Sequence, residues 1–297
     1  MGKALHEASA TARLVFEEVD EALKQNLTKL MFEGPPDELQ LTENTQPALM
    51  AVSLAIVRVL EKEAGFSIAE QVGFVAGHSL GEYSALAAAG ALSVEDTARL
   101  LKQRGQAMQR AVPVGEGAMA ALLGLDLPVA EEVAKEAAEG EVCAPANDNA
   151  PGQVVVSGHK AAVERAVEIA KTKGARRAML LNVSAPFHCP LMAPAAAEMA
   201  EALKAVQINP PVRPLVANVT AKEISQPEEI RRLLVAQVTG LVRWRESVMY
   251  MAAAGIDTFV ELGSGKVLTG LVKRINGDVT GVSIQGPDDI DAFLKSL

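Results

Sequence analysis

The stretch that decides the fold runs from Val72 to Glu82 and reads VGFVAGHSLGE. Its first five residues, VGFVA, form the short apolar run that is typical of a buried parallel strand. A G-x-S-x-G pentapeptide follows at 77–81, and the next residues, YSALAAA, favour a helix. Strand, tight turn and helix predict an exposed, nucleophilic Ser79, with glycines on both sides that let the chain reverse. The backbone N–H of Leu80 would then face a developing oxyanion.

The composition describes a globular protein and excludes several classes of partner. The 297 residues suffice for one large α/β domain, or for a large domain with a smaller insertion. A net charge of −9 argues against nucleic-acid binding. Segment 1–20 lacks the apolar core of a signal peptide, and no run of about 18 apolar residues is available to span a bilayer. We therefore expect a cytoplasmic protein with no membrane partner.

The two cysteines indicate neither a disulfide framework nor a metal site. Cys143 and Cys189 are too few for the first, and no C-x-x-C pattern supports the second. Cys189 is a candidate nucleophile, but a cysteine beside proline and leucine is more often a small buried hydrophobe.

Helices and short apolar strands alternate along the chain, which is typical of an α/β fold. Apolar residues at helical spacing predict a helix over 45–64. Ser93 begins a capping-box-like start of a second helix, which would run to about Val112. Further strands of the same buried type are expected at 215–217, 258–262 and 279–284.

The middle of the chain has a different order. Strands are expected at 118–123, 142–146, 154–157 and 178–183, with helices at 129–138 and 160–173. This β-α-β-β-α-β order is the ferredoxin-like arrangement. The NDNAPG connection at 147–152 has the residue types of a hairpin loop. We therefore predict a small subdomain, residues 114–184, inserted into an α/β core formed by 1–113 and 185–297.

A nucleophilic serine needs a base, and the chain offers four histidines. His6 is remote from any motif, and His78 precedes Ser79 and should point away from it. His159 is expected to open a surface helix. His188 follows the last subdomain strand and lies between two prolines, which hold a loop stiffly and can aim one side chain. We therefore predict His188 as the base of Ser79.

Arg104 is a candidate ligand for a carboxylate. It lies on the predicted helix after Ser93, and Gly105 follows it, although a mid-helix glycine costs roughly 1 kcal/mol. A glycine at this position suggests the close approach of another backbone or of a ligand. Near the nucleophile, a guanidinium would offer two parallel donors to a carboxylate. An ordinary solvated helix arginine is the alternative.

Several motifs, taken in order, resemble those of the malonyl-CoA:acyl carrier protein transacylases, the acyltransferases of fatty acid synthesis. They are TQPAL at 45–49, GHSLGEYSALAAAGAL at 77–92, QRG at 103–105 with Met108, NAPGQ at 149–153, FH at 187–188, Gln237 with VRW at 242–244, and ELGSGKVL at 261–268. The similarity covers nearly the whole sequence. It implies an α/β-hydrolase-like core with a parallel sheet and a ferredoxin-like insertion, in agreement with the patterns above.

The resemblance implies a two-step, ping-pong transfer. Malonyl-CoA would acylate Ser79, while His188 takes the serine proton and later returns one to the leaving thiolate. The malonyl group would then pass to the phosphopantetheine thiol of acyl carrier protein. The coenzyme A thioester is a substrate in this scheme, and no cofactor is implied.

Three further roles follow from the resemblance. Arg104 would pair with the free carboxylate of malonate, so that an acetyl group would leave a buried guanidinium unpaired. Phe187 would crowd out a 2-methyl branch. The backbone carbonyl of Gln237 would orient the imidazole of His188, in place of the usual triad acid.

The sequence departs from the family at its start. The family's chain opens with a strand and a G-Q-G-S-Q turn, whose first glutamine N–H supplies half of the oxyanion hole. Met1 aligns just after that turn, so we expect the opening strand and its donor to be absent. Removing one oxyanion donor typically costs about 10²–10³ in rate.

Acyl carrier protein is acidic, so its docking site should be basic despite the overall negative charge. Arg176 and Arg177 are the predicted docking residues. The other candidate docking positions are Lys171 and Lys173, in the same cluster, and a second cluster of Lys266, Lys273 and Arg274. Ordinary solvated faces are the alternative for each, and we expect the protein to be a monomer.

Two other functions remain open from the sequence. A serine hydrolase or thioesterase would use the same Ser79 and His188 pair with water as the acceptor. A non-catalytic docking subunit would bind carrier protein without turnover.

Overall fold

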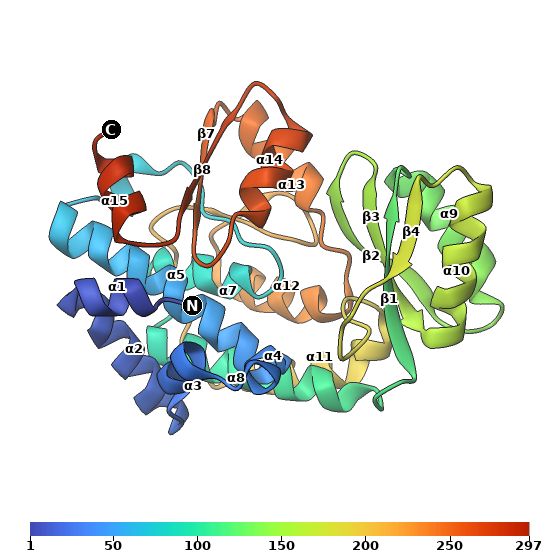
Figure 1. Cartoon of the computed structure of the whole chain (residues 1–297), viewed down its shortest axis with the longest axis horizontal. Coiled ribbons are helices and arrows are strands. Elements are labelled where there is room, and N and C mark those ends of the chain that lie inside the picture. The colour runs from blue at the N-terminus through green and yellow to red at the C-terminus, as the bar shows by residue number, and fades with distance from the viewer. Residues whose placement is uncertain (297) are drawn as a thin grey trace.

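The computed structural model describes residues 1–296. Figure 1 shows a larger, mainly helical core and, beside it, a four-stranded sheet covered by two helices. The chain enters this smaller part after α8 and returns from it before α11, so both ends of the sequence belong to the core.

Helices make up most of the core. They are α1 (Lys3–Ala8), α2 (Ala10–Leu23), α3 (Leu27–Glu33), α4 (Pro36–Gln40), α5 (Thr42–Ala64), α6 (Ile68–Gln71), α7 (Gly81–Ala88), α8 (Val94–Ala111), the 3-10 turn η1 (Pro190–Met192), α11 (Ala193–Lys204), α12 (Pro227–Thr239), α13 (Trp244–Ala253), α14 (Val267–Ile275) and α15 (Pro287–Leu294). The predicted helices over 45–64 and after Ser93 are confirmed as α5 and α8. Ser93 caps α8, because its Oγ accepts a hydrogen bond from the Asp96 N–H at 3.0 Å.

The strands of the core are short and form separate pairs. They are β5 (Leu215–Val216), β6 (Glu223–Ile224), β7 (Thr258–Leu262) and β8 (Thr280–Ile284). β7 and β8 run parallel, as expected, whereas β5 pairs antiparallel with β6. The expected strand over 72–76 is wrong in extent, since only Val75 forms a bridge, parallel to Leu215.

The physical reason is that each strand has few hydrogen-bonded neighbours: β7 and β8 pair with each other, and β5 pairs with β6 and, through a single bridge, with Val75. Isolated two-stranded pairs are marginal by themselves. Here helices cover them: α5 packs against β7, α7 packs against β5, and α14 and α15 pack against β8. The α/β character of the core is therefore maintained by helix packing rather than by one continuous parallel sheet.

The smaller part contains β1 (Gly117–Leu123), α9 (Leu127–Ala138), β2 (Cys143–Ala150), β3 (Gln153–His159), α10 (Lys160–Thr172) and β4 (Arg177–Leu180). Its sheet is antiparallel with the strand order β2-β3-β1-β4. Helices α9 and α10 pack together on it over a separate apolar core. Element order and strand order agree with the predicted ferredoxin-like arrangement, while its boundaries at 114 and 184 stay a prediction.

The predicted hairpin loop at 147–152 is mostly strand. β2 continues to Ala150 with two irregularities in its pairing to β3, and the turn itself is Pro151–Gly152. Contacts with the core explain the difference. The Asp148 N–H donates to the Val242 carbonyl at 2.9 Å, and the buried Asp148 carboxylate pairs with Arg245 at 2.8 Å. β2 thus joins the small sheet to the core.

Candidate active site

Ser79 lies in a strained turn directly before α7. Its φ is 53°, the left-handed region that few residues other than glycine adopt. A Cβ at Gly77 would collide with the backbone of Gly81, so the turn requires glycine at 77. The expectation that Gly81 also avoids a clash is wrong, because its Cβ would point into open space.

The side chain of Asn218 is hydrogen-bonded to the backbone of this turn at two points. Its Oδ1 accepts a hydrogen bond from the Ser79 N–H at 2.8 Å, and its Nδ2 donates to the Gly77 carbonyl at 2.8 Å. The side chain is fully buried. Sequence reasoning missed this residue, although a polar side chain just beyond the buried strand β5 would have indicated it.

Ser79, His188 and Gln237 form a hydrogen-bonded chain. The distance from Ser79 Oγ to His188 Nε2 is 2.7 Å, and that from His188 Nδ1 to the Gln237 carbonyl oxygen is 2.9 Å. A carbonyl can only accept, so Nδ1 carries the proton and Nε2 is free to accept the serine proton. Gln237 lies in the last turn of α12 and is fully buried, so it is not an ordinary polar residue on the surface of that helix.

His188 is held rigidly as a neutral base. It is buried, and its φ of 57° is a second left-handed backbone conformation beside that of Ser79. Burial, and secondarily the positive charge of Arg104, lowers the pKa of His188 to about 3. A neutral imidazole can accept a proton at once, which general-base chemistry needs.

Arg104 reaches the same cluster from α8. Its Nη1 donates to Gln46 Oε1 at 2.7 Å, and its Nη2 donates to Ser79 Oγ at 3.1 Å and to Gln237 Oε1 at 2.9 Å. Its Nε is buried without an acceptor among the described residues. Every acceptor of this fully buried guanidinium is neutral, and burial lowers its pKa. The site therefore presents a desolvated cation to an incoming anion.

Close helix packing places Arg104 there. A Cβ at Gly105 would overlap the backbone of Glu43 and Thr42, so glycine lets α8 approach α5. That approach brings Gln46 of α5 within reach of the guanidinium. The mid-helix glycine is thus explained by close approach of another backbone, one of the two explanations that the sequence left open. The sequence analysis did not identify the contact of Gln46 with Arg104.

Leu80 and Phe187 border the cluster. Among residues 1–296, the Leu80 N–H, just before α7, donates no recorded hydrogen bond. Phe187 is half-buried and packs against the core as well as against the apolar group of Met119, Ala146 and Val155. The Leu80 N–H, a free donor among residues 1–296, therefore follows Ser79 directly in the sequence, and the apolar side chain of Phe187 directly precedes His188.

The rings of the other three histidines are bonded to, or packed against, groups other than Ser79. The His78 ring bonds Asn149 Oδ1 through Nε2 at 2.8 Å, and burial lowers its pKa. His159 precedes α10 and accepts from the Val142 N–H at 2.9 Å, while His6 packs against aromatic rings. Cys189 is buried, and burial raises the pKa of its thiol, which disfavours the reactive thiolate.

Arg176 and Arg177 are not part of the cluster. Both are exposed at the start of β4, an edge strand of the small sheet. Within the part of the chain that the structure describes, neither forms an ion pair. Their cationic groups are therefore directed to solvent.

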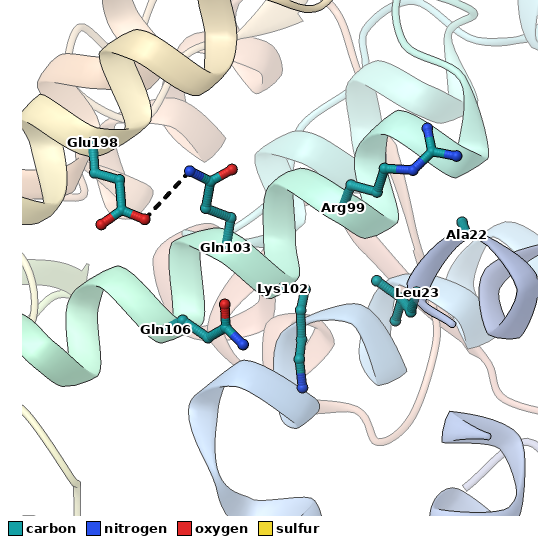
Figure 2. A pocket seen from close by; sticks show the side chains of 7 residues that line it. All are labelled: Ala22, Leu23, Arg99, Lys102, Gln103, Gln106 and Glu198. Atoms are coloured by element: carbon teal, nitrogen blue, oxygen red, sulfur yellow. Dashed lines mark hydrogen bonds between the residues drawn. The ribbon is translucent and has the colours of Figure 1, made fainter. Parts of the chain in front are cut away.

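A surface pocket of about 350 Å³ lies on the opposite face of α8. Figure 2 shows its side chains, which come from α2, α8 and α11: Ala22, Leu23, Arg99, Lys102, Gln103, Gln106 and Glu198. None of them belongs to the Ser79 cluster. In addition, residues 1–296 contain no group of three His, Cys, Asp or Glu side chains arranged to hold a metal ion. No helix in the same range has the length and apolarity to cross a membrane.

Comparisons with known proteins identify the family of the chain. The family model "Acyl transferase domain" matches residues 1–283. The malonyl CoA-acyl carrier protein transacylase of Bacillus subtilis is 44% identical, over 100% of this chain and 92% of its own length. That of Escherichia coli K12 is 47% identical, over 94% of this chain and 89% of its own.

Solved structures show the same fold. An acyl-carrier-protein-S-malonyltransferase from Bartonella henselae superposes with a TM-score of 0.97 at 56% identity, covering 100% of this chain and 94% of that one. With 152 structures and 192 curated proteins similar to it, and a family model over most of its length, the chain belongs to the acyl transferase domain family.

Proposed function

We propose that this protein transfers a malonyl group from coenzyme A to the phosphopantetheine thiol of acyl carrier protein, through a malonyl ester on Ser79. The observation that carries the proposal is the fully buried Arg104, which touches Ser79 Oγ and has only neutral acceptors among residues 1–296. An acyl group on Ser79 that ends in a carboxylate would supply that anion. An acetyl group would leave the guanidinium unpaired.

The chain's residues suggest how the first half of the reaction proceeds. The Ser79 oxygen attacks the thioester carbonyl carbon while its proton moves to His188 Nε2, 2.7 Å away. The oxyanion accepts a hydrogen bond from the N–H of Leu80, at the positive end of α7. As the C–S bond breaks, His188 returns the proton to the thiolate of coenzyme A. Gln237 keeps the imidazole in the required tautomer through its carbonyl.

The second half reverses these steps with a different thiol. His188 takes the proton of the phosphopantetheine thiol, and the thiolate attacks the ester carbonyl of malonyl-Ser79. The C–O bond breaks, and the proton returns to Ser79. All groups that this chemistry needs are side chains and backbone groups of the protein and the two thiols, so the proposal requires no cofactor.

Selection among acyl groups involves two residues. Arg104 would select for the carboxylate, as above. Phe187, fixed between the core and the small sheet, would crowd a branch at the 2-position of the acyl chain. A methylmalonyl group should therefore react more slowly than a malonyl group.

Acyl carrier protein as the partner is supported by a relative. A malonyl-transacylase solved in complex with its type II PKS acyl-carrier protein is 41% identical, with a TM-score of 0.96, over 100% of this chain and 95% of that one. We propose that Arg176 and Arg177, which are exposed at the start of β4 and form no ion pair within residues 1–296, contribute to the equivalent docking here. We further propose that the protein acts as a monomer, which its mass in solution by light scattering would test.

Intact-mass measurement after incubation with malonyl-CoA tests the function. We expect a malonyl adduct on the parent protein and none on Ser79→Ala. Transfer of the label to carrier protein, with little free malonate released, distinguishes a transferase from a thioesterase. If the parent protein forms no adduct at any concentration, the transferase proposal fails and a docking subunit becomes the better explanation.

A further inference from the structure

Glu82 is a buried acid with no part in the reaction described above. It lies in the first turn of α7, three residues after Ser79, and its side chain is 1% exposed. One carboxyl oxygen, Oε2, accepts a hydrogen bond from Gln237 Nε2. The other, Oε1, is buried without a partner among the described residues.

The Gln237 side chain connects this acid to the guanidinium. Its Nε2 also lies 2.9 Å from the Ser79 carbonyl oxygen and 3.2 Å from Asn218 Oδ1, so acceptors surround the nitrogen. Its Oε1 is left for Arg104 Nη2, at 2.9 Å. If the carboxamide turned over, its NH₂ would face the N–H groups of Arg104 and its oxygen would face three other acceptors.

We infer that Glu82 is a positioning residue for carboxylate recognition, because it fixes the Gln237 carboxamide with its oxygen towards Arg104. The guanidinium is thereby held between Gln46 and Gln237, with Nη2 against Ser79 Oγ. This inference rests on the proposed malonyl transfer. It assigns a role in acyl selection to a residue that touches neither the acyl group nor the reacting atoms.

The charge state of Glu82 adds a second consequence. Burial raises the pKa of Glu82 to about 8, although its hydrogen bonds and the positive charge of Arg104 act in the opposite direction. At pH 7 the side chain is therefore mainly a neutral acid, and Arg104 keeps its charge for the substrate. Above pH 8 the ionised Glu82 carboxylate would partly neutralise the positive charge of Arg104 and so weaken its attraction for the malonyl carboxylate.

Few other titratable groups face Glu82. Arg104 approaches from α8, and Tyr83 on its own helix has a pKa raised to about 12 by burial, so it stays neutral. α12 and the turn at Asn218 present the amides of Gln237 and Asn218. If the apparent KM for malonyl-CoA changes between pH 7 and 9 in the parent protein but not in a Glu82 variant, the change therefore arises from the ionisation of Glu82.

Single-turnover acylation of Ser79 tests the inference, with malonyl-CoA and acetyl-CoA as probes and quenched intact mass as readout. For the parent protein we expect the apparent KM for malonyl-CoA to rise about three- to tenfold between pH 7 and 9, while that for acetyl-CoA stays level. Glu82→Gln, which keeps the size and the acceptor, should retain the pH 7 value within about threefold and lose the rise.

Glu82→Leu removes the acceptor at similar volume and should lower the malonyl-over-acetyl preference by at least about tenfold. Ser84→Ala is the matched control, since Ser84 Oγ is buried on the same helix without a partner, and should behave as the parent. If Glu82→Gln shows the parental pH profile, or Glu82→Leu keeps the parental preference, the role of Glu82 is overturned while malonyl transfer stands. If the parent protein forms no adduct, both proposals fall.

Discussion

The two faces of α8 carry the same type of side chain in opposite circumstances. On the outer face, Arg99, Lys102 and Arg110 are each paired with carboxylates at 2.8–3.7 Å. Figure 2 shows Arg99 and Lys102 on this face. On the inner face, Arg104 is fully buried and bonded only to neutral oxygens.

This difference separates charges that are paired with carboxylates near the surface from one that is buried among neutral acceptors. An exposed pair gains little, because water already solvates both ions. A buried cation without an anion is costly to maintain, and such groups cluster at functional sites. The inner face is therefore the one on which we propose carboxylate binding, and four experiments test its contrast with the outer face.

The largest effect is expected from removing the inner charge. In Arg104→Ala, kcat/KM for malonyl-CoA should fall by about 10²–10³-fold, because losing one partner of a buried charge pair costs about 2–5 kcal/mol. The reaction with acetyl-CoA should lose much less. Arg110→Ala, on the exposed face, should stay within about threefold of the parent. Equal losses with both acyl groups in Arg104→Ala would contradict a carboxylate-binding role.

Next in size is the packing that holds the inner face against α5. Gly105→Ala should lower the free energy of unfolding by about 1–3 kcal/mol, since its Cβ meets the backbone of Glu43. The same substitution at Gly270, in α14 with nothing near its Cβ, should be neutral or stabilise by up to about 1 kcal/mol. Urea denaturation measures both, and a Gly105→Ala variant as stable as the parent would show that α5 and α8 can separate freely.

The inner charge should also shape the pH dependence of acylation. The folded-state pKa of His188 is lowered to about 3, so the neutral base persists as the pH falls from 8 to 5. Single-turnover acylation should change by less than about threefold over that range, whereas a histidine of pKa near 6.5 would lose about thirtyfold. In Arg104→Ala the acid limb should move to higher pH. A midpoint near 6.5 in the parent would refute the lowered value.

The smallest effect is expected on the exposed edge of β4, where Arg176 and Arg177 resemble the outer face of α8 but lack its ion pairs. Reversing both charges to Glu should raise KM for carrier protein about three- to tenfold at low salt and leave KM for malonyl-CoA unchanged. The same charge change at Lys24 and Lys204, which are paired with neighbouring glutamates, is the control. An unchanged KM for carrier protein would remove this edge from the docking surface.

Local patterns predicted the elements that depend on local rules. The apolar spacing over 45–64 and the capping serine Ser93 were sufficient for α5 and α8, because a helix satisfies its hydrogen bonds within itself. Strand extents were less reliable, as Val75 and the 147–152 segment show. A strand's length depends on which partners lie beside it, and those partners are distant in the sequence.

The candidate site divides in the same way. Ser79 could be found because its turn has a local signature, and His188 because few histidines compete. Asn218 had one local signal, its place just beyond β5, but Gln46 and Glu82 had none, since each acts by contacting a residue far along the chain or by being buried. Polar residues of these types have no local pattern that distinguishes them from surface residues.

By itself, the sequence determined a serine at a strained turn, one histidine placed to serve it, and an arginine followed by a glycine that packing would have to explain. The folded chain was needed to show that these groups converge and that Gln237 links them through both its carbonyl and its side chain. It was also needed to show that Arg104 is buried among acceptors that are all neutral within residues 1–296. The physical reason is that reactivity here arises from desolvation and from contacts between α5, α7, α8 and α12, which exist only when the helices are packed.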